Sequence, residues 1–332
     1  MASVISKEDW GIHKDHAVFL YRMENSTGAY VELTNFGASI VAVAVPDRNG
    51  HFGNVVLGFP QIKGYINDCC YVGATIGRYA NRIAFASFDL DGHHYDLKPN
   101  DGVHANHGGI AGFHKRIFDV KVHDEAISFH LTSTDGEGGF PGNLRLTVVY
   151  RWSEANELQI QYEATSDKKT ILNVTNHAYF NLSGGKTDIV NHRLQVSASH
   201  VLETTEDYIP TGVLTPCSNP SFSRIKGLNH CYVLNEAGQN RLRKAALLRD
   251  TDSGRTLEVY TSYPGLVVYS GDFLSGNVPG YAGAPYRPFD GVCLECQYFP
   301  DSPNHPDFPS TVLDIEAVYS EQILYKFTVS PA

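Results

Sequence analysis

The stretch Ile171–Leu182 reads Ile-Leu-Asn-Val-Thr-Asn-His-Ala-Tyr-Phe-Asn-Leu, and it combines the apolar content of a buried strand with many hydrogen-bonding side chains. The aliphatic and aromatic members predict a strand inside a β-sheet. If the asparagines and His177 are buried, they need hydrogen-bond partners or a ligand that supplies them. Histidine exchanges a proton near neutral pH because its unperturbed pKa is about 6.5. His177 is therefore either a core histidine with satisfied hydrogen bonds or an acid–base group.

Length, charge and composition restrict the possible classes of protein. The 332 residues suggest about two domains, or one long all-β sandwich, and we expect a single domain over residues 1–332. No apolar run approaches the roughly 18 residues of a membrane span, and the first residues lack the apolar core of a signal peptide. We therefore expect a cytoplasmic protein without membrane contacts. A formal net charge of −10, with no run rich in lysine or arginine, argues against nucleic-acid binding.

The six cysteines include one Cys-x-x-Cys motif, Cys293–Cys296. This motif is found in zinc sites and in redox pairs. No second Cys-x-x-Cys follows, and residues three apart on a strand point to opposite faces of the sheet. We expect free thiols in a reducing cytosol. Histidines that are distant in the sequence can still converge on a metal ion, but the chain has no His-Glu-x-x-His or similar close pair, so we expect no metal.

Short segments of strand character, separated by turn residues, recur along the whole chain. Leu144–Trp152 is predicted to pair with Leu158–Ala164, and Phe88–Leu90 forms a hairpin with His93–Leu97 around Asp-Gly. Further strands are predicted at Ala29–Leu33, Ala38–Val45, Asn54–Phe59, Val120–Val122, Ile127–Thr132, Leu247–Arg249, Thr256–Thr261, Leu266–Tyr269, Gly291–Gln297 and Ile323–Val329. Few segments have a helical period, so the fold class is all-β, a large antiparallel sandwich.

The segment Ile76–Ile83 places Arg78, Asn81 and Arg82 among small and apolar residues. A guanidinium presents forked donors that suit sugar oxygens as well as carboxylates. Structural ion pairs are the alternative for both arginines. The segment therefore contributes either to a binding site or to the core.

Two more segments carry a single ionisable residue in an unusual setting. His107 is followed by two glycines, which let the backbone approach a ligand closely, whereas His104 and His114 are predicted to be surface residues. Glu295 interrupts an apolar strand. Burial raises the pKa of a carboxyl group unless donors stabilise its charge, so Glu295 is either the partner of an arginine or a base.

With these residues the chain resembles the galactose mutarotase, or aldose 1-epimerase, family over nearly its whole length. The ordered motifs that carry the resemblance are Asn35–Ala38, Val56–Phe59, Gly77–Ala84, His107–Gly109 with Gly112-Phe113, Thr175–Leu182, Gly227–Leu234, Tyr269–Gly276, Leu294-Glu295 with Gln297, and Pro300–Pro309. The resemblance implies a large antiparallel β-supersandwich. It also implies an enzyme that interconverts the α and β anomers of a free aldohexose of the glucose or galactose type, with no cofactor.

Carried over position by position, the resemblance implies that Glu295 is the general base and His177 the general acid. Sugar-binding residues are implied at Asn81, Arg82, His107 and Asn229, and Tyr179 borders the pocket, while Arg78 has a structural role only. Three positions depart from the family's pattern: Asn229 stands where an aspartate is usual, Val267 where many members have glutamine, and Asn106 where leucine is common. These departures leave the catalytic pair intact and concern the preference for a sugar.

Two other functions remain open from the sequence. An epimerase of hexose 6-phosphates on the same fold would need a cluster of positive donors, which the acidic balance of the chain disfavours. A non-catalytic carbohydrate-binding sandwich would not need a matched acid and base. We expect a small-molecule sugar as the partner, and a monomer or a homodimer.

Overall fold

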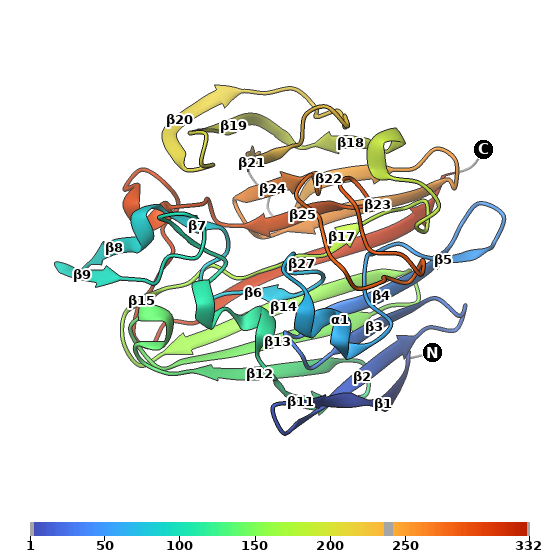
Figure 1. The fold of residues 1–332 in the computed structure, drawn as a ribbon, viewed down its shortest axis with the longest axis horizontal. Coiled ribbons are helices and arrows are strands. Elements are labelled where there is room, and N and C mark those ends of the chain that lie inside the picture. Colours follow the sequence, from blue (N-terminus) through green and yellow to red (C-terminus); the bar gives the residue numbers. More distant parts are fainter. Residues whose placement is uncertain (1–2, 236–241, 331–332) are drawn as a thin grey trace.

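The computed structural model describes residues 3–235 and 242–330, and it consists almost entirely of antiparallel β-structure (Figure 1). The largest sheet has eight strands in the order β11-β12-β13-β14-β27-β23-β22-β18. Figure 1 shows it running from β11 at the bottom of the view to β18 near the top. Its strands are Asp119–Val122, Ile127–Ser133, Leu144–Trp152, Glu157–Ser166, Tyr319–Val329, Arg255–Thr261, Arg243–Arg249 and Arg193–Val196.

Two further sheets pack against the eight-stranded one. A five-stranded sheet, β1 to β5 in order, comprises Val4–His13, His16–Glu24, Tyr30–Thr34, Ser39–Pro46 and Phe52–Asn54. A six-stranded sheet in the order β17-β25-β24-β21-β19-β20 comprises Tyr179–Phe180, Val292–Gln297, Gly265–Tyr269, Asn229–Leu234, Ala198–Thr204 and Pro210–Pro216. Side chains from all three sheets, such as Val31, Val148 and Leu294, join one hydrophobic cluster, so the core lies between the sheets.

The remaining elements are short. Two-stranded sheets pair β6 with β16, β7 with β10, β8 with β9 and β15 with β26: Thr75–Ile76, Thr175–Asn176, Arg82–Ile83, Ala105–Asn106, Ser87–Leu90, His93–Asp96, Thr170–Ile171 and Val312–Leu313. Within the described residues, α-helix is limited to α1 (Ile62–Asn67), and no helix combines the length and apolar character that a membrane crossing requires. Single 3₁₀ turns occur at Ala84–Ala86, Gly109–Ala111, Phe113–Lys115, Glu137–Gly139, Ile189–Asn191 and Ser302–Asn304.

The predicted pairing of Leu144–Trp152 with Leu158–Ala164 is confirmed as β13 and β14, and the Asp-Gly hairpin is confirmed as β8 and β9. The strand predicted at Asn54–Phe59 is wrong, because β5 ends at Asn54. The Asn54 side chain accepts from the backbone N–H groups of Val43 and Val56 and so replaces a ladder acceptor at this point.

Ile171–Leu182 is buried as expected, but it is not one strand. It contains the end of β15 and all of β16 and β17, three two-residue strands that each pair with a different partner. Its asparagines cause the interruptions, because their side chains bond to backbone groups: Asn173 bonds with Tyr298 and Asn176 with Gly73. His177 therefore lies between two short strands, β16 and β17, that belong to different sheets.

Candidate active site

Glu295 lies in the middle of β25, where all six residues are buried. The residue is 2% exposed, and within the described part of the chain its Oε2 has no hydrogen-bond partner. Burial raises the pKa of the Glu295 carboxyl to about 8, against the opposing effect of the Arg82 charge. The resemblance of the chain to the aldose 1-epimerase family implied that Glu295 is a base. The structure gives this residue the environment of a carboxyl group that holds a proton near neutral pH.

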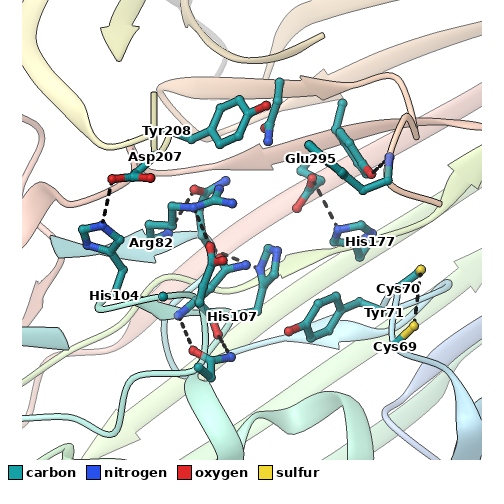
Figure 2. A pocket seen from close by; sticks show the side chains of 18 of the residues that line it. Cys69, Cys70, Tyr71, Arg82, His104, His107, His177, Asp207, Tyr208 and Glu295 are labelled. Carbon is teal, nitrogen blue, oxygen red and sulfur yellow. Dashed lines mark hydrogen bonds and ion pairs between the residues drawn. The ribbon is translucent and has the colours of Figure 1, made fainter. Parts of the chain in front are cut away.

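His177 sits between β16 and β17, held by backbone hydrogen bonds to Ala74 and Gly73. Its Nε2 lies 3.7 Å from Oε1 of Glu295 (Figure 2). Its Nδ1 lies 3.4 Å from the Sγ of Cys293. Burial lowers the pKa of His177 to about 4. His177 therefore faces a carboxyl group at the pocket, in the position that an acid–base role would require.

The two opposite pKa shifts give the pair one shared proton over a wide range of pH. Below a pH of about 4 both groups hold a proton, and above about 8 neither does. Between these limits the pair carries a single proton, and burial alone places it on Glu295. Such a pair can remove a proton from one oxygen and give a proton to another in the same event.

His107 and Asn81 form a rigid unit beside this pair. The backbone N–H of Asn81 donates to Nδ1 of His107 at 3.2 Å, and the N–H of His107 donates to the carbonyl of Asn81. Both residues have a positive φ, 67° at Asn81 and 52° at His107. This hydrogen bond assigns the proton of the neutral His107 ring to Nε2. Burial holds the pKa of His107 well below its usual value, so His107 presents a fixed neutral donor.

The same hydrogen bond bears on metal binding. Ligand atoms of His107, His177 and Glu295 lie within 4.8 Å of one another, the spacing of a metal site. A metal at Nε2 of His107 would move the ring proton to Nδ1, where it would meet the N–H of Asn81. The tautomer fixed by Asn81 therefore suits hydrogen-bond donation and opposes ligation.

Arg82 reaches the pocket from β7. Its Nε donates to Asp101 at 2.8 Å, and its guanidinium lies 5.1 Å from the ring centroid of Tyr208. The side chain is 13% exposed, and its two terminal nitrogens remain as donors for a ligand in the pocket. By contrast, Arg78 is buried outside this pocket and donates to Ser133 and to carbonyls of the loop at Pro141–Gly142.

The pocket above the pair has a volume of about 640 Å³. Figure 2 shows Arg82, His107, His177 and Glu295 around one space. It is also lined by predicted residues Tyr179 and Asn229, and by residues that the sequence did not single out: Cys69, Cys70, Tyr71, Asn100, Asp101, Gly102, Val103, Glu206, Asp207, Tyr208, Tyr269 and Phe273. The structure thus brings together every residue expected at the site.

Tyr71 is the most central of the residues that were missed. Its ring centroid lies 4.7 Å from that of His107, 4.6 Å from His114 and 5.7 Å from His177. The prediction that His104 is a surface residue is wrong. His104 is buried and lines the pocket, because its Nδ1 accepts from the backbone N–H of Phe85. His114 is partly buried beside Tyr71.

The unusual residues Asn229 and Val267 both lie near Glu295. Asn229, at the start of β21, lines the pocket. Val267 is directly opposite Glu295 in the register of β24 and β25, and it packs against Leu202 and Cys231. Directly opposed residues share a face of the sheet, so the carboxyl group has an apolar neighbour where glutamine would offer a donor.

Comparisons with known proteins agree with this geometry. The family model described as aldose 1-epimerase matches residues 20–326. The chain belongs to the aldose 1-epimerase family. It is 38% identical over 315 residues to the galactose mutarotase of Mus musculus, covering 90% of this chain and 91% of that protein. It is also 38% identical over 309 residues to the aldose 1-epimerase of Escherichia coli (strain K12), covering 87% and 89%.

Solved structures of the aldose 1-epimerase family share the fold. An aldose epimerase homologue from C. elegans superposes with a TM-score of 0.85 at 28% identity, covering 99% of this chain and 100% of that one. The galactose 1-epimerase from Lactobacillus acidophilus NCFM also gives 0.85, at 26% identity with 99% and 100% coverage. These findings confirm the resemblance, the galactose mutarotase-like fold and the isomerase class expected from the sequence.

Proposed function

We propose that this protein catalyses the interconversion of the α and β anomers of a free aldohexose of the glucose or galactose type. One observation carries the proposal: a buried acid–base pair, His177 and Glu295, lies 3.7 Å apart at the floor of a pocket of about 640 Å³. Membership of the aldose 1-epimerase family supports it.

In the proposed reaction Glu295 removes the proton of the C1 hydroxyl while His177 donates a proton to the ring oxygen. The bond between C1 and the ring oxygen breaks, and C1 becomes an aldehyde carbonyl. Rotation about C1–C2 presents the other face of this carbonyl, and the reverse transfers close the ring as the second anomer. Only protons move, so these steps require no cofactor.

The charged form of the pair is the reactive one for ring opening, since Glu295 then has a free lone pair and His177 a proton to give. Burial alone favours the neutral form, with the proton on Glu295. The charge of Arg82 favours the ionised carboxylate. A sugar hydroxyl that donates to Glu295 strengthens this effect, so we propose that bound substrate shifts the shared proton to His177.

The remaining residues are proposed to hold the sugar. His107 would donate from Nε2 to the oxygen that gains negative charge, in an orientation fixed by Asn81. Arg82 and Asn229 would bind hydroxyl groups. Tyr179 is buried and its hydroxyl donates to the carbonyl of Cys70, so its role is to pack against the His177 ring at 5.1 Å.

The charges of the pocket argue against a sugar phosphate. Arg82 is the only lysine or arginine among the described lining residues, and it already donates to Asp101. Glu206 and Asp207 add further acidic side chains at the pocket. A phosphate would meet more negative than positive charge here. A purely sugar-binding protein would not need the shared proton of Glu295 and His177.

The decisive experiment follows optical rotation, or the anomeric proton signals in NMR, after α-D-glucose or α-D-galactose is freshly dissolved. The protein should speed the approach to equilibrium over the spontaneous rate without changing the end point. Parallel samples with glucose 6-phosphate test the phosphate alternative. A sugar that binds without any change of rate would overturn the proposal in favour of a binding protein.

We also propose one domain over residues 1–332, a cytoplasmic location, and a monomer or homodimer in solution. The common hydrophobic cluster of the three large sheets supports the single domain. The free thiols of all six cysteines suit a reducing compartment. One cooperative unfolding transition, and a sedimentation measurement of mass, would test the first and last of these proposals.

A further inference from the structure

Two consecutive cysteines, Cys69 and Cys70, lie at the lip of the pocket in the loop after α1. Cys69 is exposed, and Cys70 is 9% exposed with its thiol donating to the carbonyl of Ser275. Their sulfur atoms are 3.9 Å apart, and Figure 2 shows the two side chains directed toward each other beside Tyr71. The proposed acid–base chemistry uses neither thiol.

Two neighbouring cysteines can form a disulfide or can chelate one thiophilic centre. A disulfide needs the sulfurs at about 2.05 Å and Cα atoms about 4.4–6.8 Å apart, whereas consecutive Cα atoms are about 3.8 Å apart. A disulfide here would therefore strain the peptide unit. Two thiolates bound to one tetrahedral zinc ion at about 2.3 Å stand roughly 3.8 Å apart. The sulfurs of Cys69 and Cys70 are in non-bonded contact at 3.9 Å, so both can reach one thiophilic centre with only a small movement of the side chains.

We propose that Cys69 and Cys70 form a chelating dithiol that binds a thiophilic centre, Cd²⁺ or a trivalent organoarsenical, and thereby blocks the pocket. With an arsenical oxide, RAs=O, both S–H protons pass to the oxygen, which leaves as water. Two As–S bonds replace the As=O bond and the two S–H bonds, and arsenic stays trivalent. With Cd²⁺ the two thiols release two protons and the ion is bound by both sulfurs.

The backbone of Cys69 and Cys70 is connected to the pair of His177 and Glu295 through neighbouring side chains. The carbonyl of Cys70 accepts from the hydroxyl of Tyr179, which packs on His177. The next residue, Tyr71, has a φ of 59°, and its ring packs at a tilt against the rings of His107 and His177. A bound centre at the sulfurs occupies the lip and alters the setting of Tyr71. Its inhibitory effect rests on the proposed function.

The test uses phenylarsine oxide and intact-protein mass spectrometry, which need no enzymatic activity. The unaltered protein should carry one arsenical in the presence of excess 2-mercaptoethanol and lose it to 2,3-dimercaptopropanol. Cys69→Ser should weaken retention by about 10²–10⁴-fold, because the second thiol then no longer adds its intramolecular bond. Cys217→Ser, which removes an isolated, partly exposed cysteine, should retain the adduct fully.

Retention by Cys69→Ser equal to that of the unaltered protein, or no retention by the unaltered protein, would overturn the proposal. Cys70→Ser serves as a second variant, with its folding checked by circular dichroism. An adduct that forms yet leaves the rate of mutarotation unchanged would overturn the blocking role. If no aldose is converted at all, the proposed function fails, while the mass spectra still decide the dithiol site.

Discussion

Replacing Val267 by glutamine should shift the alkaline limit of activity toward lower pH. Val267 stands opposite Glu295 on the same face of β24 and β25, and Oε2 of Glu295 has no partner among the described residues. A glutamine side chain offers two N–H donors within reach of this carboxyl group. Donors to the charged form of a carboxyl group lower its pKa.

The size of the shift follows from the strength of one new hydrogen bond. A hydrogen bond to a charged group is worth about 1.5–3 kcal/mol, and one pKa unit corresponds to about 1.36 kcal/mol. The pKa of Glu295, raised by burial to about 8, should therefore fall by roughly one to two units. Above this pKa the pair of His177 and Glu295 holds no proton and is inactive. A lower pKa of Glu295 therefore moves the alkaline limb of the pH–rate profile to lower pH. At a pH of about 8, activity relative to the optimum should drop at least fivefold.

Polarimetry of glucose and galactose from pH 4 to 10, corrected for the spontaneous rate, measures both limbs. For the unaltered protein, the plot of rate against pH should be bell-shaped. Its acidic limb should lie near pH 4, set by His177, and its alkaline limb near pH 8, set by Glu295. Val267→Met is the matched control, since methionine has a similar length but no N–H donor, and its alkaline limb should stay near 8. An unmoved limb in a folded Val267→Gln protein would refute the assignment of that limb to Glu295.

Three further predictions concern the same site. Glu295→Gln and His177→Asn should each lower the rate by about 10²–10⁴-fold with folding intact, measured by polarimetry and circular dichroism; an active Glu295→Gln protein would contradict the proposed base. Incubation with EDTA followed by gel filtration should leave the rate unchanged, and recovery of a lost rate by one metal would contradict purely side-chain chemistry. Asn229→Asp should strengthen sugar binding by about 1 kcal/mol, which lowers KM several-fold and leaves kcat nearly constant. If KM instead rises for one sugar in a panel of aldoses, that sugar is a different natural substrate.

Local patterns in the sequence predicted the long strands well. In the hairpin of β13 and β14, buried residues alternate with half-buried or exposed ones over the whole length, so both strands and their pairing follow from the sequence. The separation of Cys293 from Cys296 was also predictable, since the two thiols join different clusters on opposite faces of β25. In contrast, β1 is mostly exposed and rich in charged residues, so only its pairing with β2 makes it a strand.

The residues of the site were predicted through the family resemblance and not through local pattern. Nothing near His177 in the sequence indicates that Glu295 will lie 3.7 Å away. Tyr71, Asp101 and Tyr208 were missed because each lies in a loop, and loop residues meet only when the whole fold is complete.

The short strands explain why periodicity fails at this particular place. Arg82 lies in β7, His107 directly follows β10, and His177 lies between β16 and β17, all of which are two residues long. A continuous strand sends successive side chains to opposite faces, so it can offer only every second residue to a pocket. Breaking the strands, with asparagine side chains and positive φ angles at the breaks, lets close neighbours such as Asn81 and Arg82 serve the same pocket. The departure from strand periodicity is thus a requirement of the site, and it is why these segments read poorly as strands in the sequence.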